Sequence, residues 1–355
     1  MIIRKDEAVV ASLRAAVLRW YDGHGRDLAW RKGERDAYRV WLSEVMLQQT
    51  TVAHATPYYD KFLRLWPTVG ELASAEDGRI MAEWAGLGYY ARARRLLECA
   101  RVVVRDHGGV FPDDEAALLG LPGFGPYTAA AVAAIAFGKA ANVVDGNIER
   151  IMTRLYAIEE ALPAAKAAVR EAAAQWVSAD RAGDWPQALM DLASLVCRPK
   201  APLCGECPLA TACLAFQRGE PERFPVKLEK AARPRRHGVV FLIIAGDAVV
   251  VERRPDKGLL GGMLGLPHTE WRDRPWKDAE VRGPDLEFTK AGRYEHVFTH
   301  FALTQEVWLA RISGVQGQAL IRTHNDWQLL PLADQRSLPT VFHKALKFET
   351  YGSLI

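Results

Sequence analysis

The pattern of apolar and polar positions divides the chain into two parts of different character. Up to about residue 215, apolar residues recur three or four positions apart, which is the spacing of one helix face. After residue 237 the pattern changes to short runs of β-branched residues, such as GVVFLIIAGDAVVVERR at 238–254. We therefore expect an all-helical part followed by an α+β part.

The elements can be located from this pattern and from turn residues. A first helix is predicted over 6–21, ending at Gly23 and Gly25. In the second part, two β-branched runs flank Gly246-Asp247, which is a hairpin signal, and 295–312 again resembles strands. Further helices are predicted at 38–50, 57–66, 71–85, 90–107, 114–120, 126–138, 145–157, 163–178 and 186–196.

The boundary between the two parts is marked by prolines and charges. The segment 215–236 contains Pro221, Pro225 and Pro234 among many charged residues, which is typical of an extended linker. The resulting prediction is a helical domain at 1–214, the linker, and an α+β domain at 237–355.

Composition narrows the class of protein. With 355 residues the chain is long for one core, which favours two domains, and 49% hydrophobic with 25% charged residues is ordinary for a globular protein. The net charge of +3 permits an anionic partner without requiring one. MIIRKDEAVV lacks a signal-peptide core, and no apolar run reaches 18 residues, so we expect a cytoplasmic, nucleoid-associated protein without membrane spans.

Four cysteines are clustered in one short segment. Cys197, Cys204, Cys207 and Cys213 follow the pattern C-x6-C-x2-C-x5-C. Buried free thiols, structural zinc and a 4Fe–4S cluster are the three interpretations. Because only one C-x2-C pair occurs, with single cysteines on either side, the spacing favours the 4Fe–4S cluster. Cys99 stands alone in an apolar helical run and is expected in the core.

A tight turn precedes an alanine-rich helix near the middle of the chain. Leu-Pro-Gly-x-Gly-Pro at 121–126 must bend sharply, and Gly123 and Gly125 reach dihedral angles that other residues avoid. The free amides of the next helix would then suit a phosphate, although an ordinary turn between packed helices has the same pattern. Tyr127 places a phenol at this helix start.

Two carboxylates are candidates for acid–base chemistry. Asp145 follows an apolar pair and precedes Gly146, so it is a plausible helix N-cap. Glu44 lies in an otherwise apolar helical stretch, where burial would raise its pKa as a general acid requires. The alternative for Glu44 is a solvated helix face, and Gln48, Gln49 and Thr50 suit base edges or solvent alike.

Together these segments resemble a known family. SEVMLQQT at 43–50, GLGYYARAR at 86–94, LPGFGPYTAAAV at 121–132 and VVDGNIER at 143–150 resemble MutY-type adenine DNA glycosylases. That family belongs to the helix-hairpin-helix, iron–sulfur branch of the endonuclease III superfamily. The resemblance implies a helix-hairpin-helix at 115–138, an iron–sulfur loop at 197–213 and a Nudix-like (MutT-like) second domain.

The resemblance also implies a reaction. Such an enzyme flips out adenine mispaired with 8-oxoguanine or guanine in double-stranded DNA and hydrolyses its N-glycosidic bond, leaving an abasic site. Glu44 matches the general acid, and Asp145 matches the carboxylate that faces the sugar. Tyr127 and Asn147 match residues that support Asp145 and the departing base. A monomer acting on DNA is implied, and an Na, K or Ca ion at the hairpin turn is left open.

Further contacts follow from the matched positions. RDLAWR at 26–31 resembles the family's adenine-pocket segment, with Ala29 in place of proline and one extra residue between Arg31 and Glu44. Without the resemblance, core packing would be the preferred account of Tyr89. The implied adenine pocket is Arg26, Trp30, Arg31 and Gln187; the implied DNA and lesion contacts are Gln48, Gln49, Thr50, Leu87, Tyr89, Gly123, Gly125, Phe298, Thr299 and His300, with Arg198 and Lys200 facing phosphates.

The second domain carries its own signature. RRPDKGLLGGMLGLP at 253–267 and HVFTH at 296–300 resemble the MutT-like domain of these proteins. The glutamate-rich REx2EE-type helix of a working Nudix hydrolase is missing from the sequence, so hydrolysis of nucleoside triphosphates is disfavoured. Thr299 stands where the family's Phe-Ser-His motif has serine and keeps the hydroxyl. An ordinary strand residue remains the alternative for His300.

Two other functions are weighed against adenine excision. An endonuclease III-like glycosylase/lyase would carry a lysine where this chain has Tyr127, and a phenol cannot form a Schiff base with the sugar. A catalytically silent DNA-binding iron–sulfur protein would not need Glu44 and Asp145, which are both present. The sequence therefore favours a monofunctional glycosylase.

Overall fold

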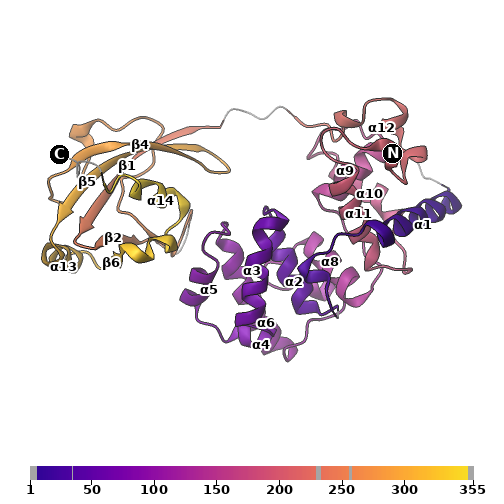
Figure 1. Cartoon of the computed structure of the whole chain (residues 1–355), viewed down its shortest axis with the longest axis horizontal. Coiled ribbons are helices and arrows are strands. Elements are labelled where there is room, and N and C mark those ends of the chain that lie inside the picture. Colours follow the sequence, from indigo (N-terminus) through magenta and orange to yellow (C-terminus); the bar gives the residue numbers. More distant parts are fainter. Residues whose placement is uncertain (1–5, 34, 229–232, 256–257, 351–355) are drawn as a thin grey trace. The chain divides into compact units, whose positions relative to one another are not determined.

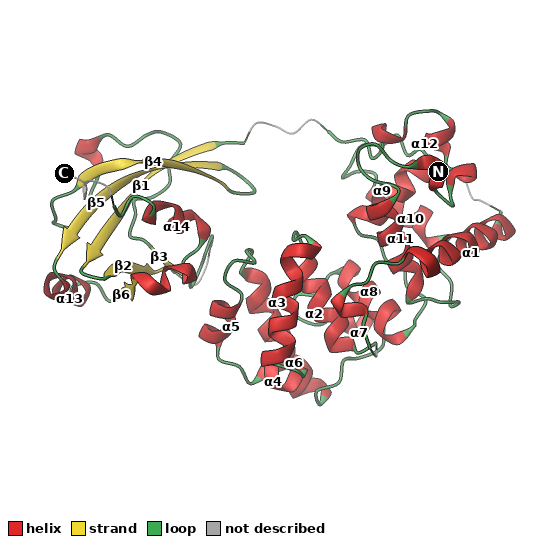
Figure 2. Ribbon diagram, viewed as in Figure 1, coloured by secondary structure: helices red, strands yellow, loops and turns green. Residues whose placement is uncertain are grey.

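The computed structural model describes residues 6–33, 35–228, 233–255 and 258–350 (Figure 1). Contacts between residues divide the chain into two compact units. The helical unit comprises the described residues of Met1–Glu83 and Ala91–Glu229, and the sheet unit those of Trp84–Tyr90 and Lys230–Ile355. Each unit is described by itself. Figure 2 shows helices throughout the first unit and strands in the second, which confirms the predicted all-α and α+β classes.

The helical unit is built from helices of 4 to 18 residues. The longest, α1, begins with Asp6, whose side chain accepts hydrogen bonds from Ala8 and Val9 amides. The helices are α1 (Glu7–His24), α2 (Ala37–Leu47), α3 (Val52–Leu65), α4 (Val69–Ala73), α5 (Asp77–Glu83), α6 (Ala91–His107), α7 (Glu115–Leu119), α8 (Pro126–Phe137), α9 (Gly146–Leu155), α10 (Lys166–Ala174), α11 (Asp184–Leu195) and α12 (Leu214–Gln217).

Two predicted helices differ from the structure for local reasons. The helix expected over 57–66 begins earlier, at Val52, because the Thr51 hydroxyl caps it by accepting a hydrogen bond from the His54 amide. The helix expected over 71–85 is two helices, α4 and α5. α4 ends at Ser74, whose hydroxyl donates to the Gly70 carbonyl, and the chain turns before α5 begins at Asp77.

Two central helices form the core of the helical unit. All residues of α8 from Thr128 to Ile135 are buried, and α8 packs against α2, α7 and α11. α2 is buried from Val40 to Met46, and its Trp41 ring stacks on Phe124 with centroids 6.3 Å apart. A helix that is apolar on every side lies inside a domain. Side chains from α2 and α8 are therefore held by packing on all sides.

The sheet unit contains one mixed sheet with strand order β3-β2-β1-β5-β4, and β6 pairs with β2. β1 and β5 run parallel, with Arg235 opposite Ala302, while the other pairs are antiparallel. The strands are β1 (Arg235–Ala245), β2 (Ala248–Arg253), β3 (Leu264–Gly265), β4 (Thr289–Val297), β5 (Ala302–Ile312) and β6 (Trp327–Pro331).

Both faces of this sheet are covered. α14 (Thr340–Leu346) packs its Val341 and Phe342 on one face, and α13 (Gly314–Arg322) packs on the other (Figure 1). β1 is buried from Gly238 to Ala245. Because both faces of the sheet are covered, this strand is a continuous apolar run instead of an alternating one. The predicted hairpin at Gly246-Asp247 is confirmed, since Ala245 pairs with Ala248 and Gly246 has a φ of 66°.

The segment predicted as an extended linker is folded in its first part. Ala215 and Phe224 are buried against Ala157, and the Val226 carbonyl accepts a hydrogen bond from the Leu162 amide at 2.9 Å. Apolar residues among the prolines and charges explain this, because burying them outweighs the extended preference that composition alone indicates. Residues 229–232 of the linker lie outside the described residues, as do 256–257 of the 253–267 segment.

Within the described ranges, no helix is both long enough and apolar enough to cross a bilayer.

Candidate active site

A cavity of about 580 Å³ in the helical unit gathers most of the residues that the sequence singled out. It lies between α2, the start of α8, the start of α9 and α11, with the short η1 turn (Ala29–Arg31) on one side. Its lining includes Arg26, Leu28, Trp30, Arg31, Val40, Ser43, Glu44, Leu47, Gln48, Gln49, Thr50, Thr51, Val52, Tyr127, Ile135, Asp145, Asn147, Gln187, Met190 and Ser194.

A larger hollow of about 850 Å³ lies elsewhere on the helical unit. It is lined by residues such as Arg35, Arg39, Thr68 and Val110, and it contains none of the predicted site residues. Volume alone therefore does not mark the site. The smaller cavity is the candidate because it combines two carboxylates, a phenol and two guanidinium groups.

Glu44 is positioned by the central helix α2 and is only 6% exposed. Burial is the main reason that its pKa is raised to about 7. A hydrogen bond from the Tyr127 hydroxyl, at 2.5 Å, and the charge of Arg31 oppose this rise, whereas the charge of Asp145 adds to it. A carboxyl group with a pKa near neutrality can hold a proton and give it up to a substrate.

Tyr127 lies at the second position of α8, directly after Pro126. Its hydroxyl donates to Glu44, whereas the resemblance paired Tyr127 with Asp145. Burial, followed by the charges of Glu44 and Asp145, raises the pKa of Tyr127 well above the usual range, so the phenol stays protonated as a donor. The phenol therefore fixes the orientation of the Glu44 carboxyl group.

Asp145 is the N-cap of α9. One of its oxygens accepts from the backbone amides of Asn147 and Ile148 at 3.0 and 2.8 Å, and the other accepts from Asn147 Nδ2 at 2.8 Å. The local sequence Asp-Gly-Asn explains this arrangement, because an N-cap aspartate bonds the amides two and three residues later. Both oxygens are held in place at the cavity wall, where Asp145 faces the same space as Glu44.

Two arginines of the predicted adenine pocket are tied to one carboxylate. Asp191 of α11 is fully buried and binds Arg31 through two contacts of 2.6 and 2.9 Å. It also accepts from the backbone amide and the Nε of Arg26, at 2.8 and 2.7 Å. Trp30 packs edge-on against Tyr59, and Gln187 is 7% exposed and donates to the Gly183 carbonyl.

The cavity rim is a turn that follows α2. Gln49 has a φ of 57°, and the Thr50 amide donates to the Leu47 carbonyl. Arg92 of α6 donates to the carbonyls of Val45 and Met46, at 2.8 and 3.0 Å, and to the Thr50 hydroxyl at 3.3 Å. This guanidinium satisfies carbonyl groups at the end of α2 and holds the rim turn in place.

Family models match both parts of the chain. The model for the HhH-GPD superfamily of base excision DNA repair proteins matches residues 42–179, and a NUDIX domain model matches 239–348. The adenine DNA glycosylase of Homo sapiens is 34% identical over 377 aligned positions, covering 87% of this chain and 69% of that protein. The chain belongs to the adenine DNA glycosylase family.

Solved structures show the same fold for the helical unit. A thermostable thymine-DNA glycosylase is 32% identical and covers 60% of this chain and all of its own, with a TM-score of 0.55. A trapped endonuclease III–DNA intermediate is 18% identical over 61% of this chain, with a TM-score of 0.51, and supports the fold alone.

In this adenine DNA glycosylase family member, the predicted hairpin of the helix-hairpin-helix joins α7 and α8. Gly123 has a φ of 79°, and a Cβ there would lie 2.9 Å from the Cβ of Arg95, so the turn and the close packing both require glycine. Gly125 is the N-cap of α8, with a φ of −108° that any residue adopts, and a Cβ there would meet open space. The expectation of a dihedral angle that other residues avoid is therefore wrong for Gly125. Because glycine has no side chain, the first backbone amides of α8 receive no side-chain cap at this position.

The segment 84–90 contains two predicted DNA contacts. Leu87 is buried, whereas Tyr89 is 51% exposed and has a φ of 49°. Such a left-handed backbone is uncommon for tyrosine, and glycines at 86 and 88, shortly before it in the chain, also have positive φ. The strained loop therefore presents an aromatic side chain to solvent.

The four clustered cysteines lie around one small cavity. Cys197, Cys204, Cys207 and Cys213 line it together with Arg154, which is 2% exposed. The Arg154 guanidinium donates to the Cys197 sulfur at 3.3 Å and to carbonyl groups of the same loop. In the described part of the chain, no three histidine, cysteine or acidic side chains stand in the arrangement of ligands around a metal ion. Four cysteines on one cavity are nevertheless the set of donors that a thiolate-bound cluster takes.

The predicted lesion contacts form the turn between β4 and β5 in the sheet unit. The Phe298 amide donates to the Phe301 carbonyl at 2.9 Å, and the Phe298 ring packs against Trp271 and Phe301. Thr299 and His300 are exposed at the tip. A cluster of aromatic side chains thus supports a polar hairpin tip that is open to solvent.

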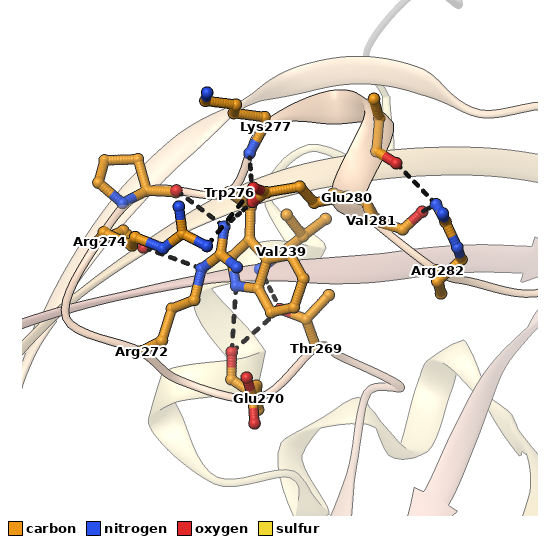
Figure 3. A network of polar contacts seen from close by, with 12 residues as sticks. Val239, Thr269, Glu270, Arg272, Arg274, Trp276, Lys277, Glu280, Val281 and Arg282 are labelled. Carbon is orange, nitrogen blue, oxygen red and sulfur yellow. Dashed lines mark hydrogen bonds and ion pairs between the residues drawn. The ribbon is translucent and has the colours of Figure 1, made fainter.

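The segment between β3 and β4 carries paired charges rather than a metal site. The structure describes residues 266–288 in full and gives them no α-helix, only the turn η5 (Asp278–Glu280). Figure 3 shows Glu280 bound by Arg272. Arg274 lies 3.5 Å from Glu280, and the Arg272 guanidinium stacks over the Trp276 ring at 3.7 Å. Asp278 pairs with Lys290 at 2.5 Å. These carboxylates are neutralised by neighbouring cations.

Sequence reasoning missed Asp191 and Arg92. Asp191 offered the same signal as Glu44, a single acidic residue inside an apolar helical run, but its arginine partners lie 160 and 165 positions away. Arg92 lay inside the motif GLGYYARAR without a role of its own. Long-range partners of this kind are not encoded in local spacing.

Proposed function

We propose that this protein removes adenine mispaired with 8-oxoguanine or guanine from double-stranded DNA and leaves an abasic site. The observation that carries the proposal is the cavity in which buried Glu44, with its pKa raised to about 7, and the fixed carboxylate of Asp145 face the same space. The relatives named adenine DNA glycosylase supply the substrate base.

The reaction begins with base flipping, because the bond to be cut is inaccessible inside a duplex. Arg26, Trp30, Arg31 and Gln187 provide a cavity wall that combines a stacking surface with hydrogen-bonding groups. By the resemblance, Gln48 and Tyr89 are wedges in the base stack around 8-oxoguanine, with Thr50 and Leu87 beside them. Wedges of this kind offset the unstacking free energy. The α8 amides after Gly125 bind a phosphate of the flanking backbone.

Hydrolysis follows from the two carboxyl groups. Glu44 transfers its proton to N7 of adenine, and the bond between N9 and C1′ breaks with its electron pair moving to the purine. Asp145 stabilises the positive charge that develops on the sugar, as in glycosidases with two carboxyl groups. Water then adds to C1′ from the side that the base has left, and the carboxylate of Glu44 accepts its proton.

The cysteines at 197, 204, 207 and 213 would hold a 4Fe–4S cluster. Bound there, the cluster supplies a rigid cross-link for the loop, and glycoside hydrolysis transfers no electron. The loop carries Arg198, which donates to the Ala201 carbonyl, and exposed Lys200. Lys200 is positioned to meet a DNA phosphate. In the sheet unit, Thr299 and His300 at the exposed hairpin tip provide the groups that distinguish 8-oxoguanine from guanine.

One experiment separates this proposal from its alternatives. End-labelled duplexes with adenine opposite 8-oxoguanine are incubated with the full chain and analysed with and without alkali. Strand breaks that appear only after alkali are expected, because no lysine occurs among the residues that line the cavity. Breaks without alkali, or borohydride-trapped covalent complex, would instead indicate a lyase, and no product would indicate a silent DNA-binding protein.

A second candidate substrate comes from the solved thymine-DNA glycosylase, which is 32% identical over 60% of this chain. A duplex with thymine opposite guanine is therefore included in the same assay. That structure covers 60% of this chain, whereas the human adenine DNA glycosylase aligns with 87% of it. Release of adenine with little release of thymine is expected, and the reverse would assign the chain to thymine repair.

A further inference from the structure

Asp191 is a buried carboxylate that the mechanism above does not use. Its side chain is fully buried on α11, and it does not line the cavity. Four hydrogen bonds reach it, two from Arg31 and two from Arg26. Burial raises its pKa, but the hydrogen bonds and charges of Arg31 and Arg26 outweigh burial and hold it below the ordinary value. Asp191 is therefore a buried anion with two cationic partners.

The two arginines stand between Asp191 and the cavity. Arg31 is 14% exposed and Arg26 is 26% exposed, and both line the cavity with Glu44. A guanidinium keeps its positive charge under all conditions relevant to proteins. Positive charge at this wall favours the ionised form of Glu44, in which the carboxyl group has no proton to give. An acid beside two guanidiniums thus needs a counter-charge.

The other groups that face Glu44 do not supply this counter-charge in full. Tyr127 of α8 is a neutral donor to Glu44, and Arg92 of α6 adds another cation at the end of α2. Asp145 of α9 is negative, but its oxygens are bound to Asn147 and the α9 amides. Asp191 forms ion pairs with both cavity arginines, so its negative charge offsets their positive charge directly.

We propose that Asp191 is a positioning residue that keeps Glu44 protonated, by holding the guanidiniums of Arg26 and Arg31 in place and cancelling part of their charge. The inference rests on the proposed function, in which Glu44 is the acid. Asp191 itself touches neither substrate nor Glu44 in this arrangement. Its effect reaches the reaction only through the two arginines.

The test is the pH dependence of adenine release, measured in single turnover with the full chain and a duplex carrying adenine opposite 8-oxoguanine. Asp191→Asn leaves both guanidiniums uncompensated, so the pH above which the rate declines is expected to fall by about one unit. At pH values about half a unit above neutrality, the rate is then expected to fall roughly tenfold. Binding of the duplex is expected to change little, since Asp191 lies behind the cavity wall.

Asp184→Asn is the matched control. Asp184 lies on the same helix and pairs with Arg35 and Arg181, and these two arginines do not line the cavity. Its replacement removes a comparable carboxylate from α11 and is expected to leave the pH profile unchanged. Asp191→Glu retains the charge and is expected to restore the wild-type pH profile even where displaced arginines lower the rate.

Further variants keep the proposal testable if Asp191→Asn does not fold. Arg31→Gln removes one cation and is expected to raise the pH above which adenine release slows. In the double variant, Arg31→Gln with Asp191→Asn, this pH is expected to be lower than in Arg31→Gln alone. An unshifted profile in folded Asp191→Asn, or equal profiles for the single and double Arg31 variants, would overturn the role of Asp191. If the wild-type chain releases no adenine, the proposed function fails instead.

Discussion

Two glutamates in the two units meet arginine in opposite ways. Glu280 of the sheet unit is bound directly by Arg272, and this hydrogen bond is the main reason that its pKa is lowered. Glu44 of the helical unit is buried next to a cavity that contains Arg31, yet its pKa is raised to about 7. The main difference is burial, because Glu44 is 6% exposed whereas the Glu280 side chain is 30% exposed. In addition, Arg31 gives hydrogen bonds to Asp191, whereas Arg272 gives one directly to Glu280.

Replacing Glu44 is expected to have the largest effect. Glu44→Gln keeps the shape and removes the proton donor, so adenine release is expected to slow by roughly 10³-fold or more. Single-turnover excision with adenine opposite 8-oxoguanine measures this. Glu280→Gln is the matched change in the sheet unit and is expected to leave the rate unaltered. Similar rates for wild type and Glu44→Gln would remove Glu44 from the mechanism.

The pH dependence of the wild-type rate is the next largest effect. Because Glu44 must be protonated and its pKa is about 7, excision is expected to be fast below this pH. Above it, the rate should fall by about tenfold for each pH unit. A single-turnover profile across this range provides the measurement. A rate that stays constant well into the alkaline range contradicts a buried acid with this pKa.

Stability is expected to depend on pH in opposite directions at the two glutamates. The pKa of Glu44 rises from 4.5 to about 7 on folding, so the folded state binds its proton more tightly and loses stability as pH rises between these values. Glu44→Gln should abolish this loss, which amounts to at most about 3 kcal/mol. Urea unfolding at pH values below and above this window compares the two proteins.

In the same urea unfolding experiment, the contribution of Glu280 to stability is expected to change with pH in the opposite direction. Its pKa is lowered in the folded state, so its contribution is present above the unfolded pKa near 4.5 and is lost as the pH falls below it. Glu280 is solvent-accessible, and the effect is expected to be small because salt and water screen the pair. A Glu280→Gln variant that is less stable than wild type only below the unfolded pKa, and equally stable above it, would contradict the assignment.

Changes at the hairpin tip of the sheet unit are expected to have the smallest effect on adenine hydrolysis itself. If the sheet unit recognises the lesion without taking part in hydrolysis, Thr299→Ala and His300→Ala should lower the preference for 8-oxoguanine over guanine opposite adenine by about tenfold each. Excision of adenine opposite guanine is the internal control and should change less. Equal losses on both duplexes would indicate a general loss of DNA binding.

The sequence predicted those parts of the site that depend on local pattern. For Glu44, an acidic residue inside an apolar helical run, the sequence leaves burial and a solvated helix face open, and the structure has it buried. Asp145, an aspartate before Gly-Asn, is predicted to cap a helix, which the structure confirms. The hairpin at Gly246-Asp247 follows equally from local turn chemistry. These features need only a few neighbouring residues to form.

The remaining features depend on residues that meet only in the folded chain. The ties from Asp191 to Arg26 and Arg31 span more than 150 positions, and no spacing rule relates them. The Tyr127 hydroxyl selects Glu44 because α2 and α8 pack together in the core. The folding of 215–226 against Ala157 likewise depends on an apolar surface that the helical unit provides.

The most direct test of the account compares adenine release by wild type and Glu44→Gln on the duplex with adenine opposite 8-oxoguanine, with and without alkali. For wild type, free adenine and strand breaks that require alkali are expected, and for Glu44→Gln the same duplex should be bound but almost uncut. Strand breaks without alkali, or undiminished release by Glu44→Gln, would contradict a monofunctional glycosylase driven by a buried acid.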